Sequence, residues 1–173
     1  RLPWNMQTAP IYGVLTTDMD MNGNLDFIAV GNSYAPDVVS GRCDAFIGQV
    51  MLGDGSGNFA SMDVNVSGFF ADGDAKSIVQ LTSGGDLLTI VGQNNDSLKV
   101  FRTTDSRKLT LLKLNENEVS AIVTLENGKQ RRMETGYGSS YLSQTSKRVP
   151  VTPQMKKIVL FDATGSPTRT LEY

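Results

Sequence analysis

Short apolar segments, each closed off by turn-forming residues, are the feature that most constrains the fold of this chain. Almost every apolar run is four to seven residues long, rich in Val, Ile, Leu and Thr, and bounded by Gly, Asn, Asp or Pro. This punctuation is typical of β-strands and turns, and no segment shows convincing helical spacing. We therefore predict an all-β chain. The expected strands are residues 12–16, 25–30, 46–52, 77–81, 87–91, 98–102, 109–114, 119–125, 129–134, 156–161 and 168–172.

Two turns indicate antiparallel hairpins near the C-terminus. Glu126-Asn127-Gly128 separates two of the expected strands, and Asn-Gly readily adopts the positive φ angles that a tight turn needs. The Gly- and Pro-containing run 162–167 is expected to close the last strand pair.

An internal repeat divides the chain. A shift of 61 residues places residues 25–32 over residues 86–93, and each copy is followed by a second β-rich segment. The first copy has a longer connection, residues 33–45, which Pro36 and Gly41 predict to be a loop. The repeat ends near Asp105. We therefore predict two domains, residues 1–104 and residues 105–173.

Composition excludes several classes of function. The 173-residue chain contains no histidine, which removes the usual general base and the commonest transition-metal ligand. It is therefore not expected to be an enzyme. The net charge of -2, from 16 basic and 18 acidic residues, argues against nucleic acid as a partner. No apolar run is long enough for membrane insertion, and the single Cys43 cannot form an internal disulfide.

One motif has the spacing of a metal-binding loop. In the segment from Asp18 to Asp26, side-chain oxygens recur at alternate positions, glycine stands at the sixth position and a carboxylate at the ninth. Calcium takes six to eight oxygen ligands, and a tight loop supplies them when alternate side chains point inward. We expect side-chain ligands from Asp18, Asp20, Asn22 and Asp26 and a backbone carbonyl ligand from Asn24. The alternative is an Asp- and Asn-rich turn that caps a strand and holds no metal.

The calcium is expected to be structural, and the site to be single. Magnesium is a weaker candidate because it keeps its waters and seldom uses an all-protein cage. In the second copy of the repeat, Val79, Leu81, Ser83 and Leu87 stand where the first copy has Asp18, Asp20, Asn22 and Asp26. The second copy is therefore not expected to bind calcium in the same way.

The N-terminal part resembles a known repeat family. Residues 18–32 and 50–59 together look like an FG-GAP or VCBS repeat, the blade unit of integrin-α-type propellers, over about the first hundred residues. The resemblance implies four-stranded antiparallel blades with calcium in a loop between the first strands. We expect a partial β-propeller of about two blade units, with residues 53–59 forming a turn between blades. Because a propeller needs at least four blades to close, the chain is expected to be a fragment of a larger protein.

The C-terminal part is similar to a second family. Residues 119–130, the run 136–148 with its Tyr141-Leu142-Ser143-Gln144 stretch, and the hairpin 158–173 look like an ASPIC/UnbV domain. The run 149–153 and the last hairpin depart from that pattern, so the resemblance implies a small antiparallel β-domain that is a divergent member of the family. Such domains end large bacterial surface proteins.

These observations lead to two expectations about function. The first is a non-enzymatic, calcium-stabilised interaction module, extracellular or on the bacterial cell surface, that contacts a protein or a glycan. The second is a carbohydrate-binding surface protein of a glycan-uptake system. Its sugar-stacking aromatic residues would be chosen from Trp4, Tyr34, Phe69, Phe70, Tyr137 and Tyr141. The basic residues Arg131, Arg132, Lys147, Arg148, Lys156 and Lys157 form either a basic strip or an ordinary solvated strand face.

Overall fold

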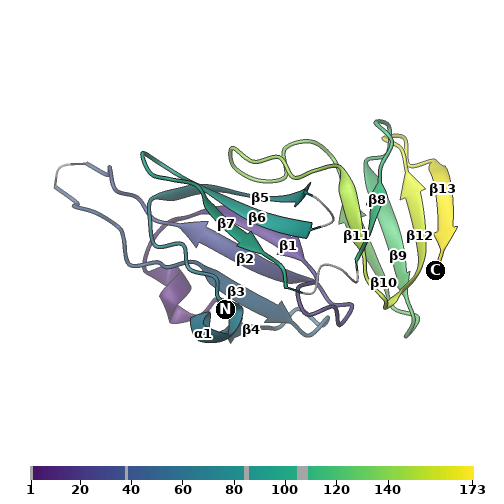
Figure 1. The fold of residues 1–173 in the computed structure, drawn as a ribbon, viewed down its shortest axis with the longest axis horizontal. Helices are drawn as coiled ribbons and strands as arrows, with labels where there is room; N and C mark the ends of the chain where they lie inside the picture. The colour runs from purple at the N-terminus through teal and green to yellow at the C-terminus, as the bar shows by residue number, and fades with distance from the viewer. Residues whose placement is uncertain (1, 38, 84–85, 105–108) are drawn as a thin grey trace.

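A computed structural model describes residues 2–37, 39–83, 86–104 and 109–173, and it shows an all-β chain built from several antiparallel sheets (Figure 1). The prediction of an all-β fold is therefore confirmed. The described residues form no closed ring of sheets. The domain boundary expected at Asp105 lies outside the described residues.

The first sheet is a four-stranded antiparallel meander. Its order is β1-β2-β3-β4, and the strands are β1 (Ile11–Thr17), β2 (Asp26–Gly31), β3 (Gln49–Gly53) and β4 (Phe59–Met62). A short 3-10 helix, η1 (Trp4–Gln7), precedes it, and a one-turn helix, α1 (Val64–Ser67), follows it.

The second sheet is a three-stranded meander that packs face to face on the first (Figure 1). Its strands are β5 (Ala75–Ser83), β6 (Asp86–Gln93) and β7 (Lys99–Arg102). Buried residues of both sheets and of the connection between α1 and β5 form one core: Leu15, Ile28, Val30, Val50, Phe69, Ala71, Ala75, Ile78 and Val91. The two sheets approach each other closely at Gly13 of β1, where an added Cβ would lie 2.9 Å from Ile78 Cγ2 of β5.

The opposite face of the first sheet is also covered. Ala29 and Met51 of this sheet bury against Met6 of η1 and Phe46, which lies in the long connection before β3. The first sheet is therefore buried on both faces, which explains why β2 reads as a nearly continuous apolar run.

The C-terminal part forms two further sheets with their own core. The larger has the order β10-β9-β12-β13, and the smaller pairs β11 with β8. The strands are β8 (Thr110–Lys113), β9 (Ser120–Leu125), β10 (Gln130–Glu134), β11 (Arg148–Val151), β12 (Met155–Phe161) and β13 (Pro167–Glu172). Their buried residues form a cluster separate from the core of the first two sheets.

An ion pair with a buried carboxylate lies within this C-terminal part. The side chain of Glu118 is fully buried, and its two carboxylate oxygens accept hydrogen bonds from Nε and Nη2 of Arg169, each at 2.7 Å. The backbone N–H of Asn115 and the hydroxyl of Thr168 donate to the same carboxylate. The Arg169 hydrogen bonds lower the pKa of Glu118, so the carboxylate is ionised in the folded protein.

We expect Arg169→Met to destabilise the protein by about 3 kcal/mol at neutral pH, because it leaves an ionised carboxylate buried without its partner. Because the pKa of Glu118 is lower in the folded protein than in the unfolded chain, ionised Glu118 stabilises the fold at pH values above the usual glutamate pKa. That stability is lost as the pH falls through the pKa of the folded state. The difference between wild type and variant should therefore shrink in acid. Urea denaturation at neutral and acid pH measures this difference in the free energy of unfolding.

Arg132→Met is the control, because the Arg132–Glu134 pair is exposed and should contribute less than about 1 kcal/mol. Equal losses in the two variants would contradict this account.

All eleven expected strands are present, although the strand expected at residues 46–52 begins only at Gln49. Strands β4 and β11 and the two short helices were not predicted. The expected role of residues 53–59 was wrong. They form the hairpin turn between β3 and β4, where Gly53 pairs with Phe59 inside one sheet, and they do not join two blades.

Candidate functional site

The candidate metal site is the loop between β1 and β2. Thr17 at the end of β1 pairs with Asp26 at the start of β2, so the ladder holds both ends of the loop. Inside the loop, Met21 and Gly23 have positive φ angles of 58° and 90°. This conformation turns the chain sharply enough to bring the side chains of both loop ends together.

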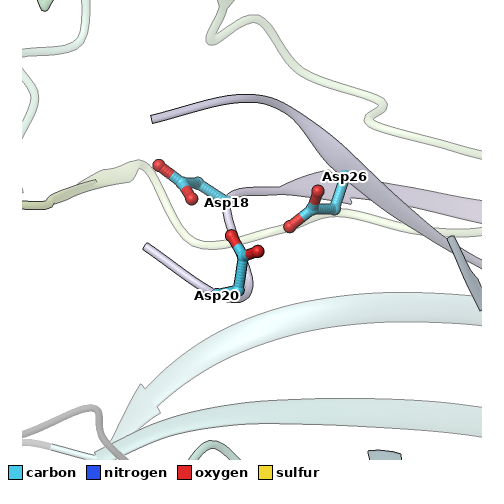
Figure 2. A group of neighbouring side chains, drawn as sticks. All are labelled: Asp18, Asp20 and Asp26. Atoms are coloured by element: carbon cyan, nitrogen blue, oxygen red, sulfur yellow. The ribbon is translucent and has the colours of Figure 1, made fainter. Parts of the chain in front are cut away.

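The loop gathers three carboxylates. One oxygen each of Asp18, Asp20 and Asp26 lie within 4.8 Å of one another. Figure 2 shows Asp20 and Asp26 directed toward the space between them, with Asp18 beside it. The side chain of Asp18 is only 3% exposed and Asp26 is 1% exposed, whereas Asp20 is exposed. The cluster thus has a buried floor and one side open to solvent.

Both carboxylate oxygens of Asp26 accept hydrogen bonds, whereas only one oxygen of Asp18 does so in the part of the chain that the structure describes. The two Asp26 oxygens accept from the backbone N–H of Met19, at 2.7 Å, and of Gly53 in β3, at 2.8 Å. Asp18 Oδ2 accepts from the N–H of Gly23, at 3.1 Å. Asp18 Oδ1 is buried and has no hydrogen-bond partner among the described residues. A buried carboxylate oxygen without a partner is costly, and a bound cation would compensate that cost.

Electrostatics also favour a cation at this position. Burial raises the pKa of Asp18, and the neighbouring carboxylates of Asp26 and Asp20 raise it further, while the Arg131 guanidinium opposes both effects. Burial likewise raises the pKa of Asp26, against the hydrogen bonds from Gly53 and Met19. The folded chain therefore holds these negative charges at a cost that a divalent cation would remove.

The side chains of Asn22 and Asn24 contact other residues of the loop and of the β3–β4 turn. The amide nitrogen of Asn22 donates to Asp20, and its side-chain oxygen accepts from the N–H of Asn24. The side-chain amide of Asn24 lies against Gly55, where an added Cβ would come within 2.3 Å of its oxygen. The structure thus brings Asp18, Asp20 and Asp26 together, and it turns Asn22 toward Asp20 and Asn24.

The sequence did not predict that Arg131 of β10 reaches this loop. Arg131 Nη1 donates to the Gly23 carbonyl at 2.7 Å and lies 3.6 Å from Asp18 Oδ2. Gly23 also packs against Leu125 of the C-terminal part, whose methyl group would lie 3.2 Å from an added Cβ. The candidate site therefore lies where the N-terminal sheets meet the C-terminal part.

A hydroxyl-rich segment, residues 139–146, makes a second contact between these parts. Ser140 Oγ accepts from the backbone N–H of Val14 in β1, and Ser143 Oγ accepts from that of Ile78 in β5, each at 3.2 Å. Ser146 N donates to the carbonyl of Gln80 at 3.1 Å. Hydroxyl groups thus satisfy the unpaired edges of two strands that would otherwise be open to other chains.

No protein-family model matches the chain, and no curated protein matches it. The assignment of a function therefore depends on the geometry of the site and on the motifs of the sequence. No helix in the described parts of the chain has the length and apolar character needed to cross a membrane.

Proposed function

We propose that the loop from Asp18 to Asp26 binds one structural calcium ion, and that the chain is a non-enzymatic interaction module of a larger secreted or surface-displayed bacterial protein. The buried, unpartnered Oδ1 of Asp18 is the observation that carries the proposal. Asp18 is one of three aspartates that each place one carboxylate oxygen within 4.8 Å of the others. A hard cation is the ligand that such oxygens bind.

Calcium suits this loop better than magnesium does. Asp26 is held by backbone amides and Asp20 lies at the solvent side, so the ligands combine fixed and adjustable oxygens. Calcium accepts irregular, higher coordination, whereas magnesium demands a near-ideal octahedron. Extracellular calcium modules also tolerate weak affinities, with Kd of about 0.1–1 mM, because calcium is abundant outside cells.

The arrangement of the first two sheets supports a place in a propeller. Both are antiparallel meanders, and they pack face to face as neighbouring blades do. The other face of the second sheet carries a cross-strand row of apolar residues, Val79, Ile90 and Val100, which is only partly covered. This row is suited to packing against a further sheet of the larger protein, as exposed apolar surface commonly is.

A glycan-binding role is the second candidate, and the exposure of certain aromatic residues favours it. Trp4 and Tyr137 are 79% and 74% exposed, and Tyr141 is 55% exposed, so each presents a ring to solvent. Phe69 is 5% exposed because it belongs to the core between the sheets, and the expectation that it contacts sugar is withdrawn.

Calcium is expected to raise the melting temperature of the metal-free protein. At a free calcium concentration of about 100 times Kd, binding stabilises the folded state by about 2.7 kcal/mol, which corresponds to about 5–10 °C for a chain of this size. Differential scanning calorimetry with calcium, with magnesium and with chelator measures the shift. A shift absent with calcium, or equally large with magnesium, would rule the proposal out.

A further inference from the structure

A cleft separates the first sheet from the C-terminal part. It has a volume of about 590 Å³ and is bounded by β1, by β10 and by residues 136–150. Pockets for small ligands measure about 300–1,000 Å³, so the cleft has the size of a binding site. Asp18 and Arg131 both line it, which places the candidate calcium loop at its wall.

Basic side chains gather in this cleft although the chain is acidic overall. Arg131, Arg132, Lys147 and Arg148 line it. The sequence suggested that Lys156 and Lys157 belong to the same strip, but they lie on β12 and are not part of the cleft lining. The basic group is therefore confined to one concave surface.

Two of the four cations are paired with carboxylates of the cleft lining. Arg131 lies beside Asp18, and Arg132 pairs with Glu134. Asp18 and Glu134 are the two carboxylates of the cleft lining, beside the four cations, whereas Asp20 and Asp26 belong to the loop behind Asp18 and are not part of the lining. Arg148 forms no ion pair with any residue that the structure describes, and its side chain is exposed. The four cations and two carboxylates give the cleft lining a net charge of about +2. A divalent ion in the loop would neutralise Asp18, make the cleft more positive and compete with Arg131 for the Asp18 carboxylate.

An aromatic ring lies at the border of the charged surface. Tyr137 lines the cleft, and the Lys147 ammonium lies 4.3 Å from the centroid of its ring. Ser139, Gln144 and Thr145 line the same cleft and offer hydroxyl and amide groups. An exposed ring beside hydrogen-bonding groups and cations suits a sugar that carries negative charge.

We propose that this cleft binds an acidic oligosaccharide, and that calcium in the Asp18–Asp26 loop is required for tight binding. The inference rests on the proposed calcium site and adds the chemical class of the ligand. Arg148 binds the anionic groups, Arg131 adds positive charge at the wall of the cleft, and Tyr137 packs against a sugar ring. Calcium acts through charge, since it neutralises Asp18, which otherwise pairs with Arg131 at the wall of the cleft.

The test uses a sulfated galactan tetrasaccharide and the same tetrasaccharide after desulfation, each titrated into the protein at physiological ionic strength. With calcium present, the sulfated form is expected to bind at least about tenfold more tightly than it binds in chelator. It is also expected to bind at least about tenfold more tightly than the desulfated form binds with calcium. Arg148→Gln and Tyr137→Ala should each weaken binding about tenfold. Lys156→Gln is the matched control and should leave the affinity unchanged.

Several outcomes would overturn the inference. If the sulfated tetrasaccharide bound equally well with calcium and with chelator, calcium would not be required. If the desulfated tetrasaccharide bound as tightly as the sulfated one, the ligand would not be an acidic saccharide. Equal weakening by Lys156→Gln and Arg148→Gln shows general charge attraction instead of a site. If calcium raised the melting temperature but no saccharide bound, this inference alone would be wrong. If calcium did not raise the melting temperature and no saccharide bound, the proposed calcium site would be wrong as well.

Discussion

Asp18→Asn is expected to weaken calcium binding about 100-fold. The substitution removes one charged ligand, worth about 3 kcal/mol in a site that is largely shielded from water, and each 1.4 kcal/mol corresponds to a tenfold change in Kd. Asp18 is the decisive position because its Oδ1 is buried and unpartnered, whereas both oxygens of Asp26 already accept backbone hydrogen bonds. Isothermal titration calorimetry of the metal-free proteins measures the loss.

The same variant separates a ligand role from a structural role. Burial raises the pKa of Asp18, so the ionised carboxylate destabilises the metal-free fold and its removal should cost little stability. Asp54→Asn is the control, because Asp54 is an exposed aspartate that accepts the N–H groups of Ser56 and Asn58 in the neighbouring β3–β4 turn. It should leave the calcium affinity unchanged. If Asp18→Asn unfolded the metal-free protein, or bound calcium as wild type does, the assignment would be wrong.

Asn32→Ala should be the most destabilising single substitution considered, at about 4 kcal/mol. Asn32 is fully buried at the end of β2 and has a φ of 87°. Its amide nitrogen donates to the carbonyls of Phe46, Asp72 and Gly73, and its oxygen accepts from the N–H of Phe46. Alanine leaves these buried backbone groups unsatisfied, at about 1–3 kcal/mol for each group that water cannot reach, and it adds strain from the positive φ.

Two companion variants separate the causes of this effect. Asn32→Gly relieves the backbone strain and keeps the loss of hydrogen bonds, so it should remain within about 1 kcal/mol of Asn32→Ala. Asn95→Ala is the matched control, since Asn95 has a φ of 56° but is exposed, and it should cost no more than about 1 kcal/mol. Chemical denaturation measures all three. Similar losses at Asn32 and Asn95 would show that the buried hydrogen bonds contribute nothing.

The elements that were predictable from the sequence are those whose burial leaves a periodic apolar pattern. Strands β2 and β9 are found where the apolar runs place them, because they lie at the centres of their sheets. Strand β4 was missed because it is an edge strand whose residues are mostly exposed, which removes the alternation that marks a half-buried strand. That omission also explains why the β3–β4 turn was interpreted as a connection between blades.

The site was predictable only in its local part. The carboxylates of Asp18, Asp20 and Asp26 share one loop, so their spacing in the sequence was enough to place them together. Arg131 is more than a hundred residues away in the chain and reaches the loop through the packing of β10. No periodicity or motif reports a contact of that kind.

The sequence repeat predicted the positions of the inner strands in both copies, but it did not predict how their residues pair. Strand β2 is an inner strand of the four-stranded meander, and β6 is the middle strand of the three-stranded one. In the first, Thr17 pairs with Asp26 across an eight-residue loop, whereas in the second, Ser83 pairs with Asp86. The second copy thus has longer strands where the first has its loop, and Val79 and Leu81 pair within the β5–β6 ladder. A gap-free shift of the sequence does not reveal such an insertion.

A crystal structure of the protein grown with calcium tests the central claim most directly. We expect anomalous difference density for one ion between Asp18, Asp20 and Asp26, with carboxylate oxygens at about 2.3–2.6 Å from it and with Arg131 displaced from Asp18. An empty loop at saturating calcium, with Arg131 still beside Asp18 and the carboxylates unmoved, would contradict the account.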